Sequence, residues 1–102
     1  MKQDPRKLYV LHDSRFNLYK IGSSARPKVR MQAISKCLGY TLDLEFVTPG
    51  HDFFLKRYEL PRVRHPIAHP GETEWYIGNE ETTDFLLMIW NDPSLAAKTR
   101  TA

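Results

Sequence analysis

Two short apolar runs near the start of the chain, residues 7–12 and 18–22, are the feature that most restricts the fold. Both are rich in β-forming residues, and residues 13–17 between them carry Asp, Ser and Asn, which favour turns. The runs therefore predict a β-hairpin. Gly22 ends the second run, and the helix-like segment behind it turns Arg30 toward its own apolar face. An arginine on such a face is costly unless a partner or ligand meets it, so we expect an anion site beside the hairpin.

Helices and strands alternate in the rest of the chain. We expect, in chain order, a helix over 26–38, a strand over 41–47, a helix over 51–60, a strand over 73–77 and a helix from 80 to about 90. Ser23 or Ser24 is expected to cap the first helix, Gly39 to end it and Asn79 to cap the last one. Prolines should keep residues 61–71 irregular. The order ββαβαβα predicts an α+β domain with a small central antiparallel sheet flanked by helices.

Apolar spacing within these segments predicts which side chains are buried. The inner face of the first helix is expected to carry Arg30, Ala33, Ile34 and Cys37. Alternation in the following strand places Leu42, Leu44 and Phe46 together on its buried face. Cys37 would then be a small core residue.

The length of 102 residues is enough for one domain with its own core, expected over 7–91 between a loose leader, 1–6, and a flexible tail, 92–102. No apolar run approaches the roughly 20 residues of a membrane span. The first residues have no apolar stretch behind them that would make a signal peptide, so we expect a cytoplasmic location. The single cysteine excludes an internal disulfide and fits a reducing compartment.

Charge is unevenly distributed along the chain, although the net charge is only +3. One basic group comprises Arg26, Lys28, Arg30 and Lys36, and a second comprises Lys56, Arg57, Arg62 and Arg64. Acidic residues gather elsewhere, at Asp43, Glu45, Glu72, Glu74, Glu80 and Glu81. This segregation favours a surface that binds nucleic acid.

The hairpin and the arginine behind it resemble the GIY-YIG nuclease domain. Lys7-Leu8-Tyr9 resembles the first signature of that family and Lys20-Ile21-Gly22 the second, and the spacing from Tyr9 to Gly22 and on to Arg30 is similar. The form Tyr-Lys-Ile-Gly resembles a phage and bacterial branch often described as a DNA-binding domain. Residues 71–76 resemble an expanded version of that branch's Gly-Glu-Trp-Phe strand, so the resemblance covers roughly residues 7–78.

The resemblance implies roles for particular residues. Arg30 would neutralise a phosphate with its guanidinium fork, Tyr9 would orient the nucleophile or donate to phosphate, and Gly22 would let the backbone approach the substrate. Lys20 stands where the family has a tyrosine, and it could hold a phosphate or act as a base if its surroundings lower its pKa. Further contacts to the substrate would come from Tyr19, Arg26, Lys28, Arg62 and Arg64.

Four of these residues also have a purely structural explanation. Tyr9 could be a strand aromatic packed in the core, and Gly22 could simply end a strand. Arg30 could form a salt bridge with Asp43 or Glu45. Lys20 could be a solvated strand lysine.

Two departures from the family bear on catalysis. The family has a metal-binding glutamate on the next helix, but the position expected for it here is Lys56. Glu59, one turn later, is a possible replacement and would bind Mg²⁺ or Mn²⁺ if the protein is active. Ile34 occupies the place of a family histidine.

The segment from His65 to His69 has two histidines four residues apart, a spacing that suits zinc only on a helix. Pro66 and Pro70 argue against a helix, which favours a loop with two surface histidines that could contact a nucleic-acid backbone. Trp75 and Tyr76 could stack on a base or pack in the core.

The sequence therefore predicts a GIY-YIG-like DNA-binding domain, and the resemblance implies that it would be a divalent-metal-dependent endonuclease if it is active. Two alternatives stay open, a catalytically inactive DNA-binding module and a protein-interaction or inhibitor module that reuses the fold. The last helix is apolar around its circumference over residues 85–90, which permits a homodimer or a partner protein but is equally explained by core burial.

Overall fold

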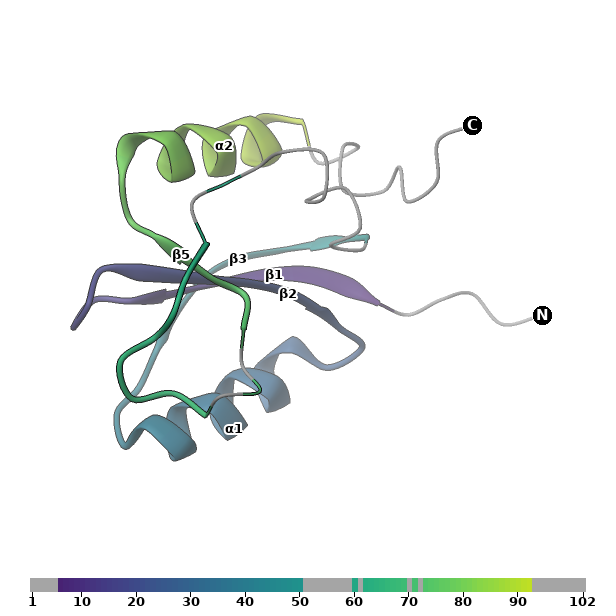
Figure 1. Cartoon of the computed structure of the whole chain (residues 1–102). Coiled ribbons are helices and arrows are strands. Elements are labelled where there is room, and N and C mark those ends of the chain that lie inside the picture. Colours follow the sequence, from purple (N-terminus) through teal and green to yellow (C-terminus); the bar gives the residue numbers. More distant parts are fainter. Residues whose placement is uncertain (1–5, 51–59, 61, 70, 72, 93–102) are drawn as a thin grey trace.

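A computed structural model describes residues 6–50, 60, 62–69, 71 and 73–92. Within these residues the elements are β1 (Lys7–Asp13), β2 (Leu18–Ser24), α1 (Pro27–Leu38), β3 (Asp43–Pro49), β4 (Arg62–Val63), β5 (Trp75–Ile77) and α2 (Glu80–Asn91). The strands form one antiparallel sheet in the order β3-β1-β2-β5-β4. The sheet lies between the two helices, with α1 against one face and α2 against the other (Figure 1). The predicted α+β class is confirmed.

Alternation along β1 builds a core on each face of this sheet. Leu8 and Val10 face α2, whereas Tyr9 and Leu11 face α1. The core on the α2 side is completed by Ile21, Tyr76, Phe85, Leu86 and Ile89. The core on the α1 side is completed by Leu18, Ile34, Leu38, Leu42 and Trp75. The central strand is therefore apolar on both faces, which explains its unbroken apolar run.

The β1–β2 turn forms where the sequence predicts it. The carboxylate oxygen Oδ1 of Asp13 accepts hydrogen bonds from the backbone N–H of Arg15 and Phe16, at 2.9 and 3.3 Å. Asn17 takes the left-handed conformation that suits asparagine, with φ of 51°. Its side-chain amide donates to the carbonyl of Gly78, 2.9 Å away, and so joins the turn to the residues after β5.

A β-bulge in β3 overturns one packing prediction. Val10 pairs with Phe46 and Leu11 with Leu44, so Glu45 is an extra residue between them. The bulge reverses the alternation. Leu44 consequently packs on the α1 side and Phe46 on the α2 side, instead of both sharing one face.

Both predicted helices in the described residues are confirmed. Pro27 opens α1, and Gly39 ends it with φ of 88°. Neither predicted serine is the N-cap; that position is Arg26, whose N–H donates to Oγ of Ser24 at 3.0 Å. Asn79 caps α2 as predicted, since its side chain accepts from the N–H of Thr82 at 3.0 Å.

Other predictions are wrong or fall outside the described residues. Residues 62–63 form strand β4, although prolines predicted an irregular segment there. Cys37 and Ala33 are exposed on α1 and do not belong to the core. The predicted helix over 51–60 lies outside the described residues except for its last position, and nearly all of the predicted leader and tail also lies outside. In the described part of the chain, neither helix has the length and apolar character needed to cross a membrane.

Candidate functional site

Two adjoining hollows are lined by the segment that follows β4, and the smaller one lies between that segment and α1. The larger, of about 460 Å³, is lined by Arg62, Val63, Arg64, His65, Ala68, His69 and Thr73. The smaller, of about 120 Å³, is lined by Arg30, Ala33, Ile34, Cys37, Leu38, Ala68 and His69. Ala68 and His69 line both, so we treat them as one surface, the cationic hollow. Among these lining residues three are arginines and none is acidic.

The cationic hollow brings together three arginines that the sequence predicts as phosphate contacts. Arg30 comes from α1 and is half-buried beside Ile34 and Leu38, as its helical spacing predicts. Arg62 and Arg64 come from β4 and the residue after it, and both are exposed. The Arg62 guanidinium lies 5.9 Å from the centre of the Tyr76 ring, a cation–π contact. Because Arg62 pairs with Tyr76, whose ring belongs to the α2-side core, this contact holds the Arg62 charge at the sheet edge on the α2 side.

Glu45, one proposed partner for Arg30, lies on the opposite side of the sheet. It lines a hollow with Tyr19 and Phe46 on the α2 side. Burial raises the pKa of the Tyr19 hydroxyl, and the Glu45 charge raises it further. The Tyr19 ring also lies 4.6 Å from the His12 ring. Tyr19 therefore does not share a surface with Arg30, contrary to its predicted role as a joint substrate contact.

Tyr9 and Gly22 form a cross-strand pair inside the α1-side core. Tyr9 is only 2% exposed. A Cβ atom on Gly22 would lie 2.7 Å from the Tyr9 hydroxyl oxygen and 2.9 Å from the ring carbon that bears it. Glycine is therefore required here to make room for the tyrosine, and the packed-core explanation of Tyr9 describes its place in the structure.

Lys20 is buried on the same face, with 2% of its surface exposed. Its Nζ lies 3.3 Å from Oε1 of Glu74, which is at the exposed end of the pair. A buried ammonium group needs such a partner because desolvation of an unpaired charge is costly. The prediction of a solvated strand lysine is wrong.

Arg26 and Lys28 lie at the start of α1, away from the cationic hollow. They line a separate hollow of about 350 Å³ together with Lys7, Pro27, Val29, Leu44 and Val47. Lys36 lines a third hollow, so the predicted basic group along the first helix is divided among three surfaces.

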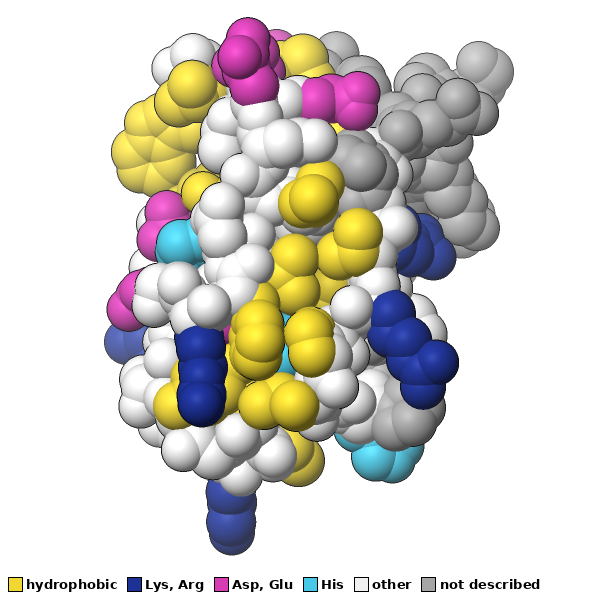
Figure 2. Space-filling model, turned by 60° about the vertical axis from the view of Figure 1, so that its left-hand side comes forward, with side chains coloured by type: hydrophobic (Ala, Val, Ile, Leu, Met, Phe, Trp, Pro, Cys, Tyr) yellow, Lys and Arg dark blue, Asp and Glu magenta, His cyan; other side chains and the backbone are white. Residues whose placement is uncertain are grey.

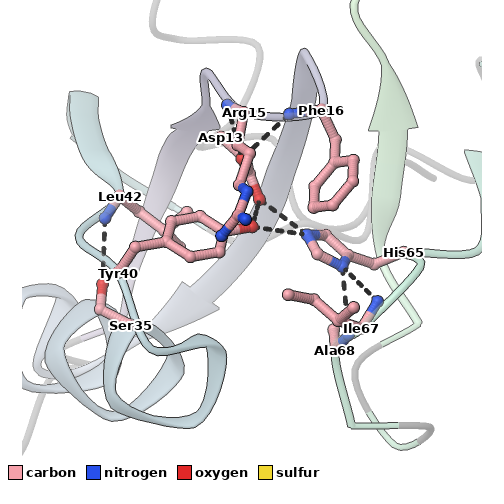
Figure 3. Close-up of polar contacts among 9 residues, drawn as sticks. All are labelled: Asp13, Arg15, Phe16, Ser35, Tyr40, Leu42, His65, Ile67 and Ala68. Atoms are coloured by element: carbon pink, nitrogen blue, oxygen red, sulfur yellow. Dashed lines mark hydrogen bonds and ion pairs between the residues drawn. The ribbon is translucent and has the colours of Figure 1, made fainter.

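A buried cluster that the sequence did not reveal joins Asp13, Tyr40 and His65 (Figure 3). Oδ2 of Asp13 accepts from the Tyr40 hydroxyl at 2.5 Å and from Nε2 of His65 at 2.7 Å. Nδ1 of His65 accepts from the backbone N–H groups of Ile67 and Ala68, each 3.1 Å away. Because Nδ1 accepts two donors, the ring proton must be on Nε2. The cluster joins the hairpin turn, the α1–β3 connection and the segment after β4.

The electrostatics of this cluster point to a structural role. Burial alone raises the pKa of Asp13, but hydrogen bonds from His65, Tyr40 and the amides of Phe16 and Arg15 outweigh it and lower that pKa. Burial, together with the hydrogen bond to Asp13 and its charge, raises the pKa of the Tyr40 hydroxyl. Asp13 therefore stays ionised and Tyr40 stays protonated. Each group is held by hydrogen bonds to its neighbours. We therefore assign Asp13, Tyr40 and His65 a structural role and call them the buried brace.

His65 and His69 have different environments, which corrects the prediction of two surface histidines. His65 is 3% exposed, whereas His69 is exposed and accepts from the N–H of Gly71 at 2.9 Å. In the described part of the chain no three His, Cys, Asp or Glu side chains gather as a metal site would need. Glu59 and Lys56 lie outside the described residues. Trp75 and Tyr76 are buried, which confirms that they pack in the core.

Comparisons of the chain with protein-family models, with curated proteins and with solved structures find no match in any of the three.

Proposed function

We propose that this chain is a nucleic-acid-binding module, with DNA as its expected ligand, and that it holds backbone phosphates in the cationic hollow. The observation that carries this proposal is that Arg30 and Arg64 line one concave surface, with Arg62 at its sheet edge, and that its described lining has no carboxylate. Arginine forks match phosphate geometry, and such contacts supply most of the sequence-independent affinity for DNA. The resemblance to GIY-YIG domains, which rests on the hairpin signatures as well as on Arg30, leads to the same ligand.

Binding without cleavage is favoured by the places of Tyr9 and Lys20. Tyr9 is expected to orient the nucleophile and Lys20 to hold a phosphate or act as a base, and each is 2% exposed. The Tyr9 hydroxyl lies over Gly22 in the core, and Lys20 is paired with Glu74. A nucleophile-orienting group has to reach the scissile phosphate within hydrogen-bond distance. Neither side chain is accessible at the protein surface.

The test is fluorescence anisotropy with a labelled 20-base-pair DNA duplex at low salt. Loss of one charge-assisted phosphate contact is worth about 1.5–3 kcal/mol, so Arg64→Gln should weaken binding about tenfold or more. Lys36→Gln is the matched control, because Lys36 is an exposed cation on α1 outside the cationic hollow. It should change affinity less than twofold.

A cleavage assay completes the test. Supercoiled DNA is incubated with the protein and Mg²⁺, Mn²⁺ or EDTA, beside an Arg30→Ala variant. We expect no nicking that depends on both the metal and Arg30. Metal-dependent nicking that disappears in Arg30→Ala would establish a nuclease instead. Equal losses of binding in Arg64→Gln and Lys36→Gln would show that the cationic hollow is not the binding surface.

A further inference from the structure

The tip of the β1–β2 hairpin carries an exposed cation and an exposed ring side by side. Phe16 is 37% exposed, and the Arg15 guanidinium lies 6.0 Å from its ring centre and 5.1 Å from the ring centre of Tyr40. The Phe16 ring meets the His65 ring edge-on, at 5.1 Å between centres. Ile67, which is 51% exposed, lies beyond His65 (Figure 3). These residues make a partly aromatic, partly exposed surface, which we call the hairpin-tip face.

The hairpin-tip face is held rigid by buried hydrogen bonds. The Asp13 carboxylate binds the backbone N–H groups of Arg15 and Phe16 on one side and His65 on the other. His65 in turn fixes the backbone of Ile67 and Ala68. A preorganised surface loses little conformational entropy when a ligand binds.

The same hydrogen bonds connect this face to the cationic hollow. His65 and Ala68 line the larger hollow, and Ala68 also lines the smaller one with Arg30. Figure 2 shows hydrophobic side chains gathered in the middle of this side of the molecule, with Lys or Arg side chains on either side of them. An apolar strip flanked by cations matches a single nucleic-acid strand, which offers flat bases between phosphates.

We propose that the hairpin-tip face is a base-stacking site, and that the ligand it takes is an unpaired nucleotide of a strand whose phosphates continue into the cationic hollow. This inference rests on the proposed function and specifies its substrate class as single-stranded or locally unpaired nucleic acid. Phe16 supplies the stacking ring, and Arg15 supplies a planar cation that both stacks on bases and attracts phosphate. Paired bases are stacked inside a duplex and cannot use this face.

The experiment compares three labelled oligonucleotides of equal length by anisotropy: a thymine single strand, the same strand with four central abasic sites, and a duplex. The abasic strand keeps every phosphate and removes only the bases. We expect the intact strand to bind roughly tenfold more tightly than the abasic strand, as stacking of one base implies. Phe16→Leu should abolish this difference, and Phe16→Trp should retain it. Neither variant should alter duplex binding.

Two controls separate the possible failures. Leu87→Ala changes an exposed apolar side chain on α2 and should leave the preference for bases intact. Circular dichroism checks that the Phe16 variants are folded. Equal binding of intact and abasic strands, with a loss in Arg64→Gln, would overturn the stacking site and leave the proposed function standing. Absence of binding to all three oligonucleotides would overturn both, and the hairpin-tip face would then be tested as a protein contact.

Discussion

Replacing Asp13 by asparagine tests the buried brace that holds the hairpin against the segment after β4. The wild-type carboxylate accepts four hydrogen bonds, from the amides of Arg15 and Phe16 on Oδ1 and from Tyr40 and His65 on Oδ2. An asparagine has one acceptor oxygen. His65 cannot switch its proton to the other nitrogen without losing the two amide donors on Nδ1.

The expected cost follows from that geometry. At least one hydrogen bond to a charged acceptor is lost inside the protein, which is worth about 1.5–3 kcal/mol. For a domain of this length, 1 kcal/mol corresponds to about 4–8 °C in Tm, so we expect Asp13→Asn to lower Tm by roughly 10 °C. Asp43→Asn is the matched control, since Asp43 is exposed on β3 and its loss should cost less than about 0.5 kcal/mol.

The effect should also depend on pH in a defined direction. The pKa of Asp13 is lowered in the folded protein, so its contribution is fully present above the unfolded value of about 3.9. It is lost as pH falls through the folded pKa. Urea unfolding followed by circular dichroism should therefore show the largest difference between wild type and Asp13→Asn at pH 7, shrinking below about pH 4. A difference no larger than that of Asp43→Asn at pH 7 would refute the brace.

Three further predictions concern local packing and exposure. Gly22→Ala should destabilise the fold by about 1–3 kcal/mol in thermal melts, because the new methyl group meets Tyr9. The loss of stability should be smaller in a Tyr9→Phe background, and an equal loss there would contradict the contact. Cys37 should react with a thiol reagent in the native protein at the rate of an exposed thiol, whereas reaction only after addition of urea would place it in the core. Asn79→Ala should cost about 1 kcal/mol through loss of the helix cap, and an unchanged unfolding midpoint would show that the cap contributes nothing.

Features of the fold that depend on neighbouring residues could be predicted from the sequence. The hairpin turn follows from Asp13, whose Oδ1 accepts from the amides of Arg15 and Phe16, and from Asn17, which takes the left-handed conformation. The ends of the helices follow from Pro27, Gly39 and Asn79 for the same reason. These signals are local, so they do not require knowledge of the tertiary structure.

Features that depend on long-range pairing could not be predicted. The bulge at Glu45 changes the face on which Phe46 packs, and it arises from pairing with β1. His65 is buried because it meets Asp13, 52 positions earlier in the chain. No short-range sequence pattern predicts either the bulge or the burial of His65.

The candidate site was predicted in part. Arg30, Arg62 and Arg64 are identifiable from charge and spacing, but their convergence with His69 follows only from the sheet order that places β4 at the edge. The environment of Lys20 was not predictable, because its partner Glu74 lies 54 positions later in the chain, just before β5. Surface cations and buried cations look alike in a sequence.

The salt dependence of duplex binding tests the central claim most directly. If Arg30, Arg62 and Arg64 each neutralise one phosphate, the logarithm of the affinity should fall with the logarithm of salt concentration with a slope of about −2.7. This corresponds to a loss of about 40-fold in affinity between 50 and 200 mM salt. An Arg30→Gln, Arg64→Gln double variant should have a slope of about −0.9. A slope that is the same in wild type and double variant, or near zero in wild type, would contradict phosphate binding in the cationic hollow.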